Sequence, residues 1–202
     1  METLILKQPV DRLKTLAACT EIANRGNQRY MLAFRLLGEE VRGNVTTYRW
    51  LDRRAGTYDL VIDPNTGVTL VRMALQLKAV EDFLLSEAKE QLTWYSRAEL
   101  RELVLSKPSG VHLTQYALGC ATVFDPEILP AFEQVLKTRS VPERTAATMA
   151  AYLLQWPELA SSLQSAAELE FVSELKAQMF FVADGLLGYI KYNEDGTLRA
   201  SR

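Results

Sequence analysis

The sequence predicts a mostly α protein, an α-solenoid of stacked antiparallel helix pairs with a small β-hairpin near residues 57–71. Two observations lead to this prediction. From residue 73 to about residue 192, apolar residues recur every three or four positions, the spacing of one helix face. The dipeptide Pro126-Glu127 also returns 31 residues later as Pro157-Glu158, and a fixed period of this size is typical of stacked helical hairpins.

The composition is that of a globular, weakly acidic chain. Its 202 residues are 48% hydrophobic, and the formal net charge is −2. Such a charge creates no global field that attracts nucleic acid or an anionic membrane. The apolar run in the N-terminal "METLILK" is short, and no stretch approaches the roughly 18 apolar residues that span a bilayer. We therefore expect a cytoplasmic protein with no membrane partner.

Residues 1–72 are predicted to form a helical pair and a hairpin that cap the repeats. Residues 10–24 have a helical pattern, and Gly26 is the expected stop. Residues 28–41 then predict a second helix, since four apolar residues share one face of a 3.6-residue period. These four residues are Tyr30, Phe34, Leu37 and Val41.

The hairpin prediction depends on "TYDLVIDPNTGVTLV", residues 57–71. Its flanks are rich in β-branched residues that alternate with others. The central "DPNTG" has the chemistry of a turn, because Pro64 restricts φ, Asn65 tolerates the left-handed region and Gly67 accepts a positive φ.

Residues 73–202 are predicted to be successive helices that form one continuous unit with the cap. The longest apolar stripe falls every three or four positions near the C-terminal end. Its members are Phe171, Leu175, Met179, Val182 and Leu186.

The repeated segments are similar to those of the HEAT-like α-solenoid family over about residues 96–165. The family pattern has an Asp-Pro-Glu opening, a leucine that closes the first helix, a Pro-Glu-x-Arg-x-x-Ala-Ala start of the second helix, here shortened to Pro-Glu-Arg-Thr-Ala-Ala, and an Ala-Leu-Gly end. These motifs lie at residues 125–127, Leu136, residues 142–147 and residues 117–119. The hydrophobic residue that this pattern places between Glu and Arg is missing after Glu143. The resemblance implies an extended binding surface.

The inventory of catalytic and metal-binding groups is small. His112 is the one histidine, and Cys19 and Cys120 lie in apolar helical patterns that favour buried free thiols. The chain has no Cys-x-x-Cys, His-Glu-x-x-His, Gly-x-Gly-x-x-Gly or P-loop motif. The sequence therefore predicts no cofactor and no metal, and it favours a non-enzymatic role.

One segment, "RGNVTTYRWLDRR", interleaves arginines with aromatic residues and makes residues 25–54 basic, with seven arginines against three acids. This composition suits a protein interface, nucleic-acid stacking, or a loop packed by its own aromatics. We take a set of partner-binding candidates from it and add Tyr116 from a second helix. The set is Arg49, Trp50, Arg53, Arg54 and Tyr116.

The function that the sequence favours is a protein–protein interaction or adaptor module whose partner carries an acidic surface. A second hypothesis follows from the family resemblance, because some HEAT-like proteins are DNA glycosylases that hold the duplex. The net charge argues against it. A third hypothesis is a small acidic bacterial immunity or inhibitor protein, which size and charge permit.

Overall fold

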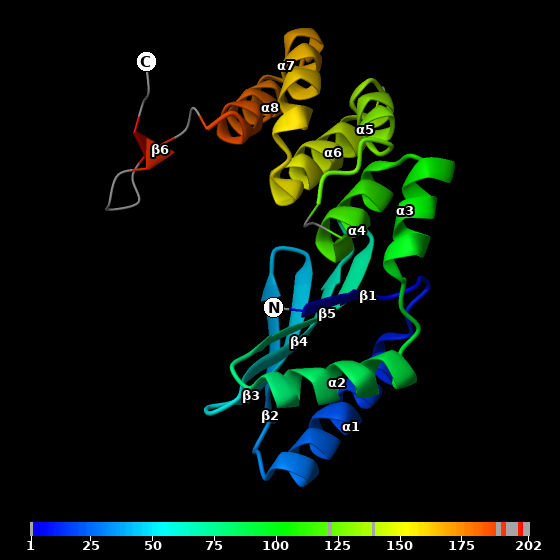
Figure 1. Cartoon of the computed structure of the whole chain (residues 1–202), viewed down its shortest axis with the longest axis vertical. Coiled ribbons are helices and arrows are strands. Elements are labelled where there is room, and N and C mark those ends of the chain that lie inside the picture. Colours follow the sequence, from blue (N-terminus) through cyan, green and yellow to red (C-terminus); the bar gives the residue numbers. More distant parts are fainter. Residues whose placement is uncertain (1, 121–122, 139, 189–190, 193–197, 200–202) are drawn as a thin grey trace. The chain divides into compact units, whose positions relative to one another are not determined.

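The computed structural model describes residues 2–120, 123–138, 140–188, 191–192 and 198–199. The chain divides into two compact units, Met1–Ser96 and Arg97–Arg202. The first contains a five-stranded antiparallel sheet, and the fold is therefore α/β. The prediction of a mostly α solenoid with one small hairpin is wrong, because the strands of this sheet extend well beyond the predicted pair (Figure 1).

The sheet has the strand order β1-β5-β4-β3-β2. Its strands are β1 (Glu2–Ile5), β2 (Arg35–Arg42), β3 (Val45–Asp52), β4 (Gly56–Asp63) and β5 (Val68–Leu75). The predicted hairpin is present as β4 and β5, the central part of the sheet. In its turn the Asp63 carboxylate accepts hydrogen bonds from the backbone N–H groups of Asn65 and Thr66, and Gly67 has φ 65°.

Two helices, α1 (Arg12–Tyr30) and α2 (Lys78–Gln91), pack side by side against one face of this sheet (Figure 1). The register places Trp50, Tyr58 and Met73 in one row on that face. All three side chains are at most 1% exposed. The core of the N-terminal unit therefore lies between one sheet face and the helix pair.

The predicted helix over residues 28–41 does not exist. Helix α1 continues to Tyr30, Met31 takes a left-handed conformation with φ 50°, and β2 follows. Gly38 has φ 125°, which no right-handed helix contains. Leu37 and Val41 are 62% and 58% exposed, so their helical spacing does not mark a buried face.

Gly26 does not end a helix either, because it lies inside α1 and is buried. A Cβ atom at this position would lie 2.8 Å from Leu84 Cδ2 of α2. The glycine therefore serves the close approach of the two helices, which outweighs its cost of about 1 kcal/mol in a helix interior.

The C-terminal unit is helical through most of its described residues. Helices α3 to α8 are α3 (Arg97–Ser106), α4 (Gly110–Cys120), α5 (Leu129–Leu136), α6 (Val141–Leu154), α7 (Ala160–Leu169) and α8 (Ser173–Leu186). A 3-10 turn, η1 (Pro157–Leu159), precedes α7, and two short strands, β6 (Lys191–Tyr192) and β7 (Leu198–Arg199), pair after α8. Among the residues described, no helix is both long and apolar enough to cross a membrane.

Candidate binding groove

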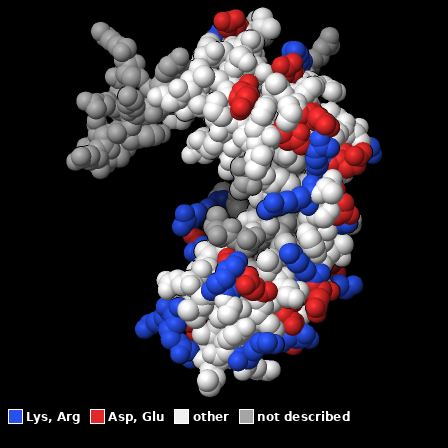
Figure 2. Space-filling model, in the orientation of Figure 1, with Lys and Arg blue, Asp and Glu red and all other residues white. Residues whose placement is uncertain are grey.

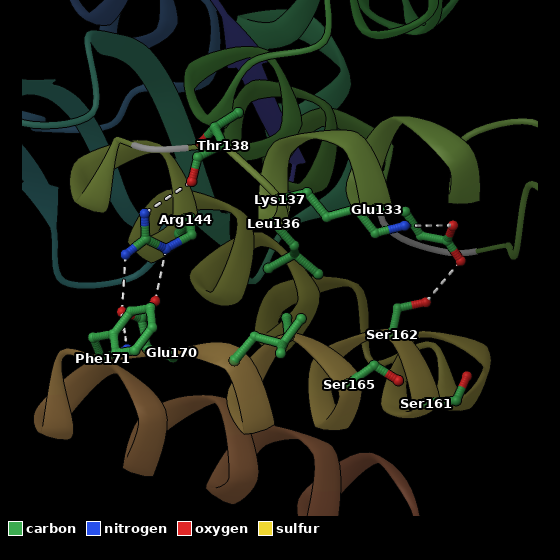
Figure 3. A pocket seen from close by; sticks show the side chains of 12 residues that line it. Glu133, Leu136, Lys137, Thr138, Arg144, Ser161, Ser162, Ser165, Glu170 and Phe171 are labelled. Atoms are coloured by element: carbon green, nitrogen blue, oxygen red, sulfur yellow. Dashed lines mark hydrogen bonds and ion pairs between the residues drawn. The ribbon is translucent and has the colours of Figure 1, made fainter.

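Helices α5 and α7, the start of α6 and the link between α7 and α8 enclose a cavity of about 580 Å³ (Figure 3). We call this cavity the α5–α7 groove. It is lined by Glu133, Leu136, Lys137, Thr138, Arg144, Ser161, Ser162, Ser165, Ala166, Leu169, Glu170 and Phe171. Its volume is in the range of about 300–1,000 Å³ that is usual for ligand pockets.

Local signals in the sequence position the walls of the groove. Helix α6 begins at Val141 because the Ser140 side chain accepts a hydrogen bond from the Glu143 backbone N–H. Helix α7 buries Ala160, Leu163 and Ala167 on one side. A different side of α7, whose residues recur every three or four positions, lines the groove. It consists of Ser162, Ser165, Ala166 and Leu169.

At one end of the groove, Arg144 and Glu170 form an ion pair with two hydrogen bonds. The Arg144 Nε donates to Glu170 Oε2 at 2.6 Å, and Nη2 donates to Oε1 at 2.9 Å. Arg144 Nη1 donates to the backbone carbonyl of Thr138. Glu170 also accepts from the N–H groups of Phe171 and Val172. The hydrogen bonds from Arg144, followed by those from the backbone, lower the pKa of Glu170 to about 2 despite its burial.

At the other end, Glu133 of α5 lies between the Ser162 hydroxyl and the Lys137 ammonium group. Its Oε1 accepts a hydrogen bond from the Ser162 hydroxyl at 3.1 Å, and its Oε2 lies 3.7 Å from Lys137 Nζ. Figure 3 shows this group and the Arg144–Glu170 pair at opposite ends, with Leu136 between them. The four charged side chains of the groove thus form two ion pairs, each of one acid and one base.

Besides the charged residues, the lining consists of four apolar and four hydroxyl side chains, and Phe171 lies at the end that holds the Arg144–Glu170 pair (Figure 3). Leu136 is buried and Ala166 is half-buried, whereas Leu169 is 76% exposed and Phe171 is 98% exposed. Phe171 was predicted to continue the buried stripe of Leu175, Met179, Val182 and Leu186. These four are buried, but Phe171 precedes α8 and is nearly fully exposed, so that part of the prediction is wrong.

The groups of the groove are suited to binding an uncharged, partly apolar ligand. The charged groups are already compensated, so the groove presents leucine and phenylalanine side chains together with serine hydroxyls. Thr138 Oγ1 is buried and has no hydrogen-bond partner among the described residues. Within the described part of the chain, no group of three or more potential metal ligands is found.

The partner-binding candidates that the sequence predicts lie outside the α5–α7 groove. Two of them, Arg49 and Trp50, point away from each other. Arg49 and Trp50 are successive residues of β3, so their side chains point to opposite faces of the sheet. Trp50 is 1% exposed in the core, and Tyr48 beside it is also buried. On the other face Arg49 forms two hydrogen bonds to Asp59, which is 2% exposed and also pairs with Arg72.

The electrostatics of this second cluster are those of a structural ion pair. Burial alone would raise the pKa of Asp59, but the hydrogen bonds from Arg49 and Arg72 outweigh it and lower the pKa. Arg49 is therefore committed to a carboxylate of its own chain. Tyr116, in α4 of the C-terminal unit, is 5% exposed and packs edge-on against Trp156, with ring centroids 6.1 Å apart. Burial raises its pKa to about 12.

Arg53 and Arg54 are the two candidates with exposed side chains, and both belong to the turn between β3 and β4. The structure brings them together with each other but not with Trp50, which lies in the core. The residues of the α5–α7 groove were missed as a site. The available signal was the stretch Leu169-Glu170-Phe171, where two large apolar residues flank an acid at a break between two helical patterns.

Comparison of the chain with models of protein families, with curated proteins and with solved structures found no match. The chemistry of the chain's own surfaces is therefore the basis for inferring its function.

Proposed function

We propose that this chain is a non-enzymatic protein-binding module, of the adaptor type, that holds an uncharged apolar segment of another protein in the α5–α7 groove. The observation that carries the proposal is the position of Leu169 and Phe171. Both are large apolar side chains, 76% and 98% exposed, and both line the same concave surface. Burying them against a partner removes apolar surface from water, at about 25 cal/mol per Å².

The state of the charged groups indicates what kind of segment fits. A ligand with its own charge would have to compete with Glu170 for Arg144 or with Glu133 for Lys137. An apolar side chain needs no such exchange, and the serine hydroxyls of α7 can form hydrogen bonds with the backbone of a peptide. Peptide recognition commonly combines an apolar anchor in a groove with a few placed polar groups.

The nucleic-acid alternative loses its principal support, because Tyr48 and Trp50 are buried in the core. Base stacking needs exposed aromatic faces. The apolar groove of the C-terminal unit favours a protein partner.

Site-specific photocrosslinking tests the proposal. A benzophenone amino acid is placed at Phe171, and the control carries the same group at Leu13 of α1, an exposed apolar position outside the groove. After irradiation in native lysate, we expect a discrete adduct from position 171 that the control lacks. Leu169→Asp in the same chain should reduce that adduct by about ten-fold, since it places a charge in an apolar contact.

The same adducts from both positions, or an adduct that Leu169→Asp leaves unchanged, would show that the groove is not the binding surface. Leu13→Asp is the matched substitution for Leu169→Asp, and circular dichroism of both variants checks that the fold persists.

A further inference from the structure

The N-terminal unit carries a second surface that the groove does not involve. Four arginines lie at one end of this unit, and we call them the arginine end: Arg29, Arg35, Arg53 and Arg54. Arg29 belongs to the last turn of α1, Arg35 of β2 is opposite Leu51 of β3, and the other two form the β3–β4 turn.

Short-range contacts hold these segments together. The Arg54 guanidinium donates to the backbone carbonyl of Met31 at 2.6 Å, which ties the turn to the end of α1. Asp52 accepts hydrogen bonds from the backbone N–H groups of Ala33, Arg54 and Ala55, which ties the same turn to the segment before β2. The arginine end is therefore built on a fixed backbone.

These arginines differ from the others of the unit in forming no ion pair with any carboxylate of the residues that the structure describes. The other five arginines of the N-terminal unit each form an ion pair with an acid: Arg12, Arg25, Arg42, Arg49 and Arg72. Among the described residues, none of the four at the arginine end forms an ion pair, and all four are exposed. Natural surfaces usually intersperse charges of both signs, so an unpaired cluster of this kind indicates a surface for an anionic partner.

The nearby acids do not neutralise the cluster. Asp52 is 4% exposed, and its oxygens are occupied by backbone N–H groups. Four arginines and Lys78 against Asp52, Glu81 and Asp82 leave a local charge of +2. At the start of α2, Glu81 and Asp82 both face Lys78. Figure 2 shows Lys and Arg side chains gathered over the end of the sheet that carries the β3–β4 turn.

The apolar groups beside the arginines indicate the class of partner. Met31 is 84% exposed and Leu37 is 62% exposed, whereas Tyr48 and Trp50 are buried. Arginine with methionine is the composition of protein interfaces, whereas a surface for single-stranded nucleic acid would need exposed aromatic faces for base stacking. We propose that the arginine end binds an acidic segment of a partner protein that also carries an apolar residue for Met31.

A direct binding measurement tests this. The probe is a fluorescein-labelled peptide of alternating Glu, Asp and Leu residues, and fluorescence anisotropy measures its Kd at about 50 mM and about 200 mM NaCl. We expect binding at the lower salt that weakens at the higher salt. Arg53→Glu with Arg54→Glu should raise Kd by about ten-fold or more, because like charges then face the peptide.

Two matched variants separate the local effect from net charge. Lys14→Glu with Lys107→Glu makes the same change in net charge at exposed positions elsewhere and should change Kd by less than about two-fold. Arg53→Lys with Arg54→Lys keeps the charge and should retain most of the binding. Equal losses in the two Glu variants, no binding at the lower salt, or tighter arginine-dependent binding of a single-stranded DNA of equal charge would overturn the proposal. None of these outcomes depends on the α5–α7 groove, so the two proposals fail separately.

Discussion

Arg144 and Glu170 are joined by two hydrogen bonds across 26 residues of sequence, and the Glu170 side chain is 1% exposed. The pair connects the first turn of α6 with the link between α7 and α8. Glu170 also accepts hydrogen bonds from the backbone N–H groups of Phe171 and Val172, just before α8. This carboxylate therefore fixes one end of the α5–α7 groove.

Replacing Glu170 with glutamine should destabilise the C-terminal unit. The change leaves the Arg144 guanidinium, 13% exposed, without a counter-charge. Breaking a buried pair in this way costs roughly 3 kcal/mol in the free energy of unfolding, measurable by urea denaturation. Glu168→Gln, at an exposed position two residues earlier, is the control and should stay within about 0.5 kcal/mol of the native chain. Equal effects would contradict the structural role of the pair.

The same carboxylate predicts a pH dependence of stability. Its pKa of about 2 in the folded chain lies below the ordinary value of 4.5. The stabilisation is therefore fully present above about pH 4.5 and is lost as the pH falls from there through about pH 2, by about 3 kcal/mol in total. Thermal unfolding as a function of pH measures this. Glu170→Gln should flatten the acid limb, and an unchanged limb would mean that other carboxylates cause it.

Gly110→Ala should destabilise the packing of α4 on α6. A Cβ at Gly110 would lie 2.6 Å from Ala146 Cβ and 2.8 Å from the backbone oxygen of Glu143, and neither atom can move without its helix. We expect a loss of roughly 1–3 kcal/mol in the free energy of unfolding. In Gly26→Ala the added Cβ meets only the flexible end of the Leu84 side chain, and alanine has the higher helix propensity. The loss in the free energy of unfolding should therefore be smaller than for Gly110→Ala. The reverse order would show that the α4–α6 approach is not tight.

Trp50→Ala should act on stability rather than directly on a partner. Its side chain is 1% exposed and stacks at a tilt against Tyr58, with ring centroids 5.4 Å apart. Removing a buried aromatic side chain costs roughly 3–5 kcal/mol in the free energy of unfolding. Arg53→Ala, three residues further on and exposed, should change stability by less than about 0.5 kcal/mol. A Trp50→Ala chain of native stability would place this residue outside the core.

The two cysteines should differ in reactivity. Cys19 is fully buried, and burial raises its pKa to about 11. Cys120 is half-buried, and burial raises its pKa as well. Because the thiolate is the nucleophile, a disulfide reagent should modify Cys120 at least about ten-fold faster than Cys19 in the native chain. Cys120→Ser should then show no fast thiol until the chain is unfolded, and a fast remaining thiol would contradict the burial of Cys19.

Several local features could be predicted from the sequence alone. The turn at residues 63–67 forms because Asp, Pro, Asn and Gly have the conformations and hydrogen bonds that a turn needs. The stripe of Leu175, Met179, Val182 and Leu186 is buried along α8 as its spacing predicts. These features depend on neighbours within a few residues of the chain.

The errors in the fold come from patterns that are compatible with two structures. Tyr30, Phe34, Leu37 and Val41 have helical spacing, yet Gly38 and the pairing of β2 with β3 make most of this stretch a strand. Gly26 could end a helix or allow a close approach, and only the position of Leu84 decides between the two.

The candidate sites show the same limit. Once β3 is a strand, its alternation separates Arg49 from Trp50, so residues adjacent in the sequence do not form one surface. Thus the sequence by itself determined the local turns, the helical stripes and the overall charge. The tertiary structure alone decided that Leu175 is covered while Phe171 is exposed, and that four exposed arginines form no ion pair within the described part of the chain. The physical reason is that burial and charge pairing depend on segments remote in sequence, which become neighbours only when the strands pair and the helices pack.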